Sequence, residues 1–170
     1  FNVISSLGTF ALAYMMATKN IHQNEYLASI YYYLHFQYNG WFFFACMGLL
    51  LDYLRVTIYS KRIYSQSFVL LFWSCIAGYF LSTLWLDLPL LIYILTAISA
   101  IVQVVVWYFL FKTILKENKS IFVTLPNYLK YLILFISFAL SAKFLLQLGS
   151  TIPAISKLAF GFRSIVIAYL

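Results

Sequence analysis

The chain has 170 residues, of which 65% are hydrophobic and 9% are charged. A soluble domain of this length carries about a quarter charged residues, so the composition excludes a soluble globular protein and predicts that lipid covers most of the surface. The net charge of +7 does not indicate nucleic-acid binding, because the basic residues lie mainly in connectors between apolar runs. The sequence therefore predicts an all-α, polytopic transmembrane helix bundle that forms a single domain over residues 1–170.

Apolar runs separated by polar connectors predict six membrane spans. The runs cover residues 3–18, 26–54, 67–85, 90–111 and 128–148, and a last run starts near Arg163. The chain begins inside the first run and ends inside the last, and both are short for a span, so we expect a truncated fragment of a longer membrane protein. Its expected partners are the lipid bilayer and the remaining helices of that protein or other membrane subunits.

Basic residues are divided unevenly between the two sides that six crossings create. Seven fall on one side and three on the other, and the more basic side is normally cytoplasmic. The seven are Arg55, Lys61, Arg62, Lys112, Lys116, Lys119 and Lys130, and the three are Lys19, Lys157 and Arg163. We therefore expect the connectors 55–66 and 112–127 on the cytoplasmic side.

The run 26–54 contains a histidine among aromatic residues. On an α-helix, one face would carry Tyr31, His35, Tyr38, Asn39 and Phe42. His35 would lie about 14 Å into the helix, within the hydrocarbon layer, where a neutral imidazole needs a hydrogen-bond partner. Two interpretations stay open: His35 bonds to a tyrosine or a carbonyl of another helix, or it ligates a metal or a haem.

Polar side chains also occur inside two other runs. Ser99 and Gln103 are four residues apart and share a helix face, which we expect to point at protein. Lys143 shares a face with Gln147. A bare ammonium at mid-membrane costs about 3 kcal/mol on insertion scales. Lys143 is therefore expected to pair with a group on another helix, or to extend toward the end of its own helix near Gln147.

The segment from His35 to Gly40 and Trp41 resembles the H-x-H-x-x-x-x-G-W motif in a late helix of subunit I of haem–copper oxidases, most closely in the cbb3-type oxidase and nitric oxide reductase branch. His35 matches the second histidine, which ligates the low-spin haem in that family, whereas Tyr33 stands at the first position and departs from the pattern. The resemblance implies a haem or metal at His35, surrounded by Tyr31, Tyr38, Asn39, Gly40 and Trp41. The family's other histidines, including the copper ligands, are not found in this sequence. The chain is also similar to uncharacterised polytopic membrane proteins of Bacteroidetes-type bacteria, which implies a bacterial inner membrane.

Three functions follow from these patterns. The first is a membrane subunit resembling haem–copper oxidase subunit I, with haem as its cofactor. The second is a transporter or channel fragment whose pathway is lined by Lys143, Gln147, Gln103 and Asn39. The third is a structural subunit in which the same polar groups only hold helices together. The sequence has no paired carboxylates, Gly-rich phosphate loop or Cys/His cluster, so no catalytic residue is assigned.

Overall fold

The fold consists of helices joined by short connections. A computed structural model of the chain describes residues 1–19, 22–54, 61–86 and 88–155. The helices are α1 (Asn2–Thr18), α2 (Gln23–Leu34), the π-helix η1 (His35–Phe42), α3 (Phe43–Tyr53), α4 (Lys61–Gly78), the 3₁₀-helix η2 (Tyr79–Thr83), α5 (Leu90–Glu117), α6 (Lys119–Thr124) and α7 (Asn127–Gly149). No β-strand occurs in these described ranges, which confirms the predicted all-α class.

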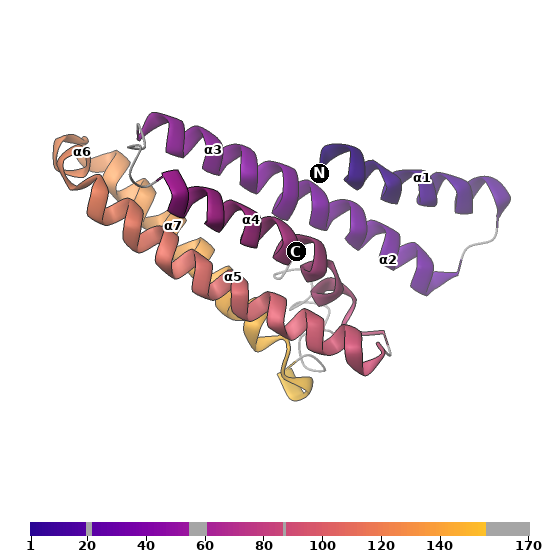
Figure 1. The fold of residues 1–170 in the computed structure, drawn as a ribbon. Coiled ribbons are helices and arrows are strands. Elements are labelled where there is room, and N and C mark those ends of the chain that lie inside the picture. Colours follow the sequence, from indigo (N-terminus) through magenta and orange to yellow (C-terminus); the bar gives the residue numbers. More distant parts are fainter. Residues whose placement is uncertain (20–21, 55–60, 87, 156–170) are drawn as a thin grey trace.

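One helical rod organises the bundle. The segments α2, η1 and α3 follow one another without a break from Gln23 to Tyr53, and α1 runs beside the α2 half (Figure 1). On the other side of the rod, α4 and α5 form an antiparallel pair, and α7 packs against α5. Twelve residues of α2 precede η1 and eleven residues of α3 follow it, so the π-helical segment lies at the middle of the rod.

The close approach of α1 to the rod depends on a residue without a side chain. A Cβ atom placed at Gly8 would lie 2.7 Å from the carbonyl oxygen of Ser29 and 2.9 Å from the backbone nitrogen of Tyr33. Small residues let helix backbones approach closely in membranes, where no hydrophobic force drives the helices together. Gly8 therefore sets the spacing between α1 and α2.

An apolar core fills the space between the α3 half of the rod and helices α4, α5 and α7. It contains Leu54, Tyr64, Leu71, Val106, Trp107, Leu110, Ile114 and Phe144. The Trp107 indole N–H donates to Ser141 Oγ at 3.0 Å, which satisfies the one polar atom of that side chain. The core packs α5 against α7. The polar residues at the middle of the bundle lie next to this core.

Three of the described helices are long and apolar enough to cross a membrane, fewer than the six spans predicted from the sequence. They cover Lys61–Thr83, Leu90–Glu117 and Asn127–Gly149. The rod is not among them, since its central polar residues lower its mean hydropathy. Helix α1 has 17 residues, and the run predicted after Arg163 lies outside the described residues. Large apolar side chains such as Phe135 and Phe138 are exposed on the outer face of α7, as expected where lipid or another membrane helix covers the surface.

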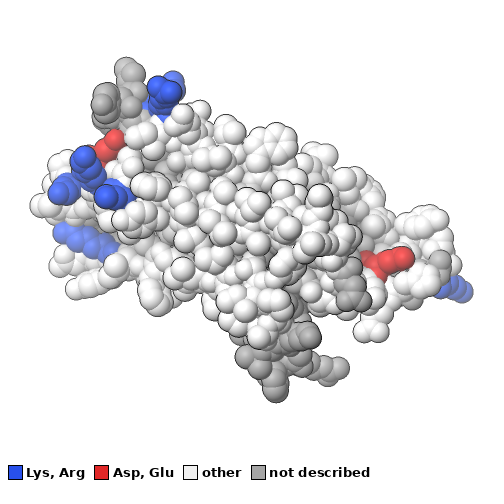
Figure 2. Space-filling model, turned by 60° about the horizontal axis from the view of Figure 1, so that its bottom comes forward, with Lys and Arg blue, Asp and Glu red and all other residues white. Residues whose placement is uncertain are grey.

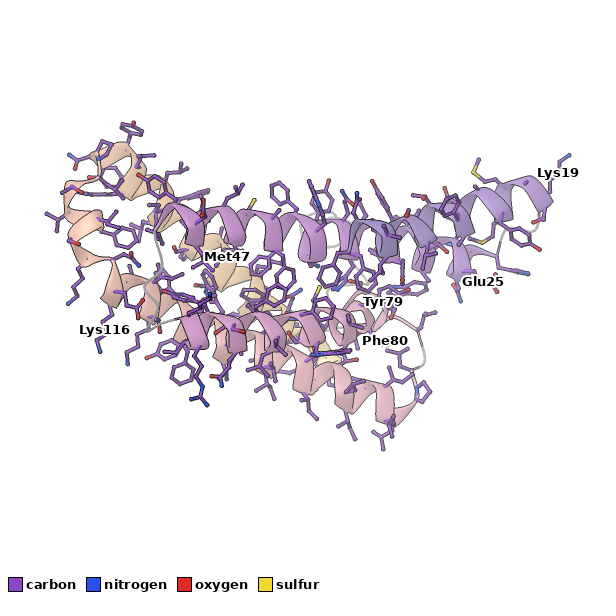
Figure 3. The ribbon with its side chains drawn as sticks, turned by 45° about the horizontal axis from the view of Figure 1, so that its top comes forward. Lys19, Glu25, Met47, Tyr79, Phe80 and Lys116 are labelled. Atoms are coloured by element: carbon purple, nitrogen blue, oxygen red, sulfur yellow. The ribbon has the colours of Figure 1, made fainter. Side chains whose placement is uncertain are left out.

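Basic residues gather at one end of the bundle. There α3 ends, α4 begins, α5 ends and α7 begins (Figure 1), and lysine and arginine side chains cluster at that end (Figure 2). Lys116 lies at this end, and Lys19 and Glu25 lie at the opposite end (Figure 3). The prediction of a connector over residues 112–127 was wrong, because α5 continues to Glu117 and α6 begins at Lys119. Residues 61–66 of the other predicted connector are the first turns of α4, and residues 55–60 lie outside the described ranges.

Candidate functional site

The site is built around the π-helical segment. In a π-helix each N–H bonds the carbonyl five residues back instead of four, and the N–H of Phe43 reaches the carbonyl of Tyr38 in this way. Such wide turns appear mostly as single insertions within α-helices and are frequent at functional sites. The segment His35–Phe42 contains the whole of the HFQYNGW sequence, from His35 to Trp41.

The wider turn changes which side chains share a face. The α-helical spacing predicted Tyr38 beside His35, but Tyr38 is 59% exposed and points away from the bundle. Trp41 is likewise 46% exposed. Asn39 remains on the same side of the helix as His35, because it lies four residues further along the chain, within one wide π-helical turn. The predicted aromatic surround at Tyr38 and Trp41 is therefore wrong, and the predicted neighbour Asn39 is present.

His35 is buried, with 4% of its surface exposed, and both ring nitrogens have partners. Nε2 lies 2.8 Å from the carbonyl oxygen of Cys75, and Nδ1 lies 3.0 Å from the amide nitrogen of Asn39. A carbonyl only accepts and an amide NH₂ only donates. The imidazole is therefore the tautomer in which Nε2–H donates to Cys75 and Nδ1 accepts from Asn39. The interpretation of His35 as a histidine bonded to a carbonyl of another helix fits this geometry.

Asn39 links His35 to Lys143. Lys143 Nζ donates to Asn39 Oδ1, so the amide accepts from the ammonium and donates to the imidazole. The ammonium also lies 5.7 Å from the centroid of the Phe144 ring. Lys143 is about 24 Å of rise from the start of α7 and faces the rod instead of lipid. Its observed partner is the side-chain amide oxygen of Asn39, a group on another helix.

Helix α4 contributes backbone carbonyls to the same region. The carbonyl of Ser74 accepts from Ser99 Oγ at 2.6 Å and from Gln103 Nε2 at 3.0 Å. Ser99 and Gln103 thus share a protein-facing side of α5, as their spacing predicted. The next carbonyl, that of Cys75, accepts from His35. The helix tightens into η2 at Tyr79, whose N–H is the α-helical partner of the Cys75 carbonyl.

Close packing at this point requires a glycine on α4. A Cβ atom at Gly78 would lie 2.9 Å from Gln103 Nε2, 3.4 Å from Ser99 Oγ and 3.7 Å from His35 Cε1. The missing side chain therefore lets the rod and α5 meet over α4. Sequence reasoning missed Ser74, Cys75 and Gly78, because the atoms they contribute are backbone atoms or an absent side chain.

These residues line a small, partly open cavity of about 20 Å³ between the rod, α4, α5 and α7. It is lined by His35, Asn39, Phe43, Phe44, Leu71, Cys75, Gln103, Lys143, Phe144 and Gln147. The space suits one or two water-sized groups. Gln147 is 93% buried, and its Oε1 atom is a buried side-chain acceptor without a hydrogen-bond partner within the part of the chain that the structure describes. Buried polar atoms are normally paired, so this atom marks the cavity as a place for a bound polar species.

The remaining residues that the resemblance placed around His35 lie elsewhere. The Tyr31 ring lies 6.4 Å from the ring of Trp85. Gly40 is in contact with the ring of Phe1, since a Cβ atom there would lie 2.6 Å from it. Gly40 thus permits a close approach by the ring of Phe1, the N-cap residue of α1.

The residues around His35 do not fit a haem in this arrangement. Axial ligation needs a free imidazole nitrogen, and both nitrogens of His35 are engaged within the protein. Ligand and cofactor sites usually measure about 300 Å³ or more, far above the cavity beside this ring. No cluster of three or more His, Cys, Asp or Glu side chains suited to a metal occurs among the described residues.

Comparison with known proteins adds no relative. No protein-family model, curated protein or solved structure matches the chain. The class that the structure defines is an all-α protein with three described helices long and apolar enough to cross a membrane and a polar cluster buried at the middle of the bundle.

Proposed function

We propose that this chain belongs to a membrane transport protein and that the cluster of Lys143, Asn39, His35, Gln103 and Gln147 forms its solute site. The observation that carries the proposal is the pairing of Lys143 with the neutral amide of Asn39 beside a small cavity that Gln103 and Gln147 also line. An ionisable group deep inside a membrane helix is costly and usually marks a solute or proton pathway. A purely structural cluster would satisfy its own polar atoms, but Gln147 Oε1 lacks a partner.

The interrupted rod supports the same proposal. Transporter sites commonly lie near the bilayer midplane where helices lose their regular hydrogen bonding. Two irregular segments meet here, the π-helical η1 and the 3₁₀-helical η2 that ends α4. Where the wide π-helical turn of η1 meets the tight 3₁₀-helical turn of η2, backbone carbonyls and side chains face the centre of the bundle instead of bonding along their own helices. Transport across the membrane, with the basic end of the bundle on the cytoplasmic side of a bacterial inner membrane, is the expected setting.

Ion flux across a membrane tests this proposal. The full-length protein is reconstituted in liposomes, and dye-reported flux is measured for a panel of small cations and anions. Wild-type vesicles should show flux of at least one ion above empty vesicles. Lys143→Met should lower it by about tenfold or more, the equivalent of one lost charge-assisted contact. Lys112→Met is the matched control, because Lys112 lies near the basic end of α5, over the Tyr108 ring. Absence of flux for the whole panel, or an equal loss in both variants, would contradict the proposal.

Haem binding at His35 is the alternative that the resemblance raises, and an absorption spectrum separates the two. The geometry leads us to expect no Soret band from the purified protein. A Soret band that disappears in a folded His35→Ala variant would instead establish ligation and replace the transport proposal with a haem-bearing subunit.

A further inference from the structure

We propose that the cavity beside Lys143 binds a small monovalent inorganic anion of about the size of chloride, held between the Lys143 ammonium and the amides of Gln103 and Gln147. The inference deepens the proposed function by naming the solute class of the same site, and the binding it describes is measurable without transport.

Charge is the first reason. The sequence has four acidic residues, Glu25, Asp52, Asp87 and Glu117. Glu25, Asp52 and Glu117 lie in the end turns of α2, α3 and α5, and Asp87 lies outside the described residues. No salt bridge to Lys143 occurs among the described residues, where its side-chain partner is Asn39 Oδ1. An ammonium in a medium of low dielectric attracts an anion strongly and repels a cation.

The unused hydrogen-bond donors are the second reason. Lys143 has three N–H bonds and directs one of them to Asn39; Gln103 has two on Nε2 and directs one to the Ser74 carbonyl. Two of the nearby acceptors are occupied, since Asn39 Oδ1 binds Lys143 and the Cys75 carbonyl binds His35. Oxygen and nitrogen of a glutamine amide are assigned from the hydrogen-bond network. A Gln147 amide oriented with its NH₂ group toward the cavity would donate to an anion there.

Size and the apolar walls are the third reason. A cavity of about 20 Å³ has room for a single ion of chloride size. The other walls are formed by Phe43, Phe44, Leu71 and Phe144. Aromatic rings are positive at their edges, which suits a weakly hydrated monovalent anion. A divalent anion would need a second cation, and Lys143 is the only Lys or Arg residue that lines the cavity in the described part of the chain.

Halide-dependent stability of the purified full-length protein tests the proposal. Melting temperature is measured in detergent at constant ionic strength while chloride or bromide replaces gluconate, which is monovalent but too large for the cavity. The wild-type protein should show a saturable rise with either halide, because a ligand that binds only the folded state stabilises it in proportion to its occupancy. Lys112→Met, the control at the basic end, should keep the full rise.

Two variants decide the outcome. Gln147→Leu removes an unpaired buried amide, so it should fold and should weaken the halide midpoint by about tenfold, the loss expected for one hydrogen bond to a charged ligand. Lys143→Met should abolish the rise. If Lys143→Met does not fold, excess line broadening of the chloride NMR signal in wild type, lost in Gln147→Leu, reports the same binding.

No rise when halide replaces gluconate, or an unchanged halide response in both variants, would overturn the anion site. Halide binding without ion flux in liposomes would remove the proposed transport function and leave the site. Flux of another ion without halide binding would remove the anion site and leave the proposed transport function.

Discussion

The bridge that Asn39 forms between Lys143 and His35 makes a quantitative prediction for a double-mutant cycle. Asn39→Leu keeps the side-chain volume similar but removes both hydrogen bonds, the one accepted from Lys143 Nζ and the one donated to His35 Nδ1. A buried polar group left without its partner costs about 1–3 kcal/mol. Because two groups lose a partner, Asn39→Leu should lower the free energy of unfolding by about 2–4 kcal/mol.

Lys143→Met removes the ammonium itself and leaves a side chain of comparable length. Replacing a buried charge by an apolar group is often close to neutral, so this variant should cost less than Asn39→Leu. In the double variant, the ammonium that Asn39→Leu would strand no longer exists. The two effects should therefore fall short of additivity by about 1–2 kcal/mol, near the upper end of hydrogen-bond couplings measured in membrane proteins.

Reversible unfolding in mixed micelles, followed by the circular dichroism of the helices, gives all four free energies. Asn39→Leu combined with Thr113→Val is the reference pair, because the Thr113 hydroxyl bonds only within α5, to the carbonyl of Phe109. That pair should be additive to within about 0.5 kcal/mol. Additivity of similar quality for Asn39→Leu with Lys143→Met would refute the bridge.

Two further predictions concern packing and orientation. Gly8→Ala should destabilise the protein by about 1–3 kcal/mol, because its Cβ would lie 2.7 Å from the carbonyl oxygen of Ser29; Gly48→Ala, with nothing within 4 Å of its Cβ, should be neutral or stabilising, and equal effects in the same unfolding assay would rule out the close contact. Cysteines introduced as Lys116→Cys and Glu25→Cys should react with an impermeant maleimide from opposite sides of sealed membranes, Lys116→Cys from the cytoplasmic side. Labelling of both from one side would contradict the arrangement of the ends.

The fold class followed from composition, because a chain with few charges has to cover its apolar side chains with lipid or with other helices. The pairs Ser99–Gln103 and Lys143–Gln147 were also predictable, since residues four apart in an α-helix share a face whatever the helix packs against. The number of spans was not, because run length alone does not show how strongly the central polar residues of the rod reduce its hydropathy.

The errors at the site have two sources. The position predicted for Tyr38 assumed α-helical spacing, and the π-helical segment places Tyr38 toward the outside. Trp41 was placed beside His35 by the resemblance to the oxidase motif, and it too is exposed. The local sequence does not specify the π-helical turn, because it depends on hydrogen bonds made to α4 and α7. The carbonyls of Ser74 and Cys75 could not be found from the sequence either, since every residue has a carbonyl and only packing decides which ones face a histidine or a glutamine.

The π-helical segment also fixes the angular phase between the two halves of the rod. Each residue of an α-helix advances about 100° around the helix axis. A π-helical turn holds one more residue than an α-helical turn without adding that rotation. If residues 35–42 adopted regular α-helical bonding without losing a residue, all of α3 would turn by about 100° relative to α2. Phe43 and Phe44, which pack against the apolar core, would then rotate away from it. The rod can thus pack against α1 along α2 and against the apolar core along α3, although these two packing surfaces lie at different angles around the rod.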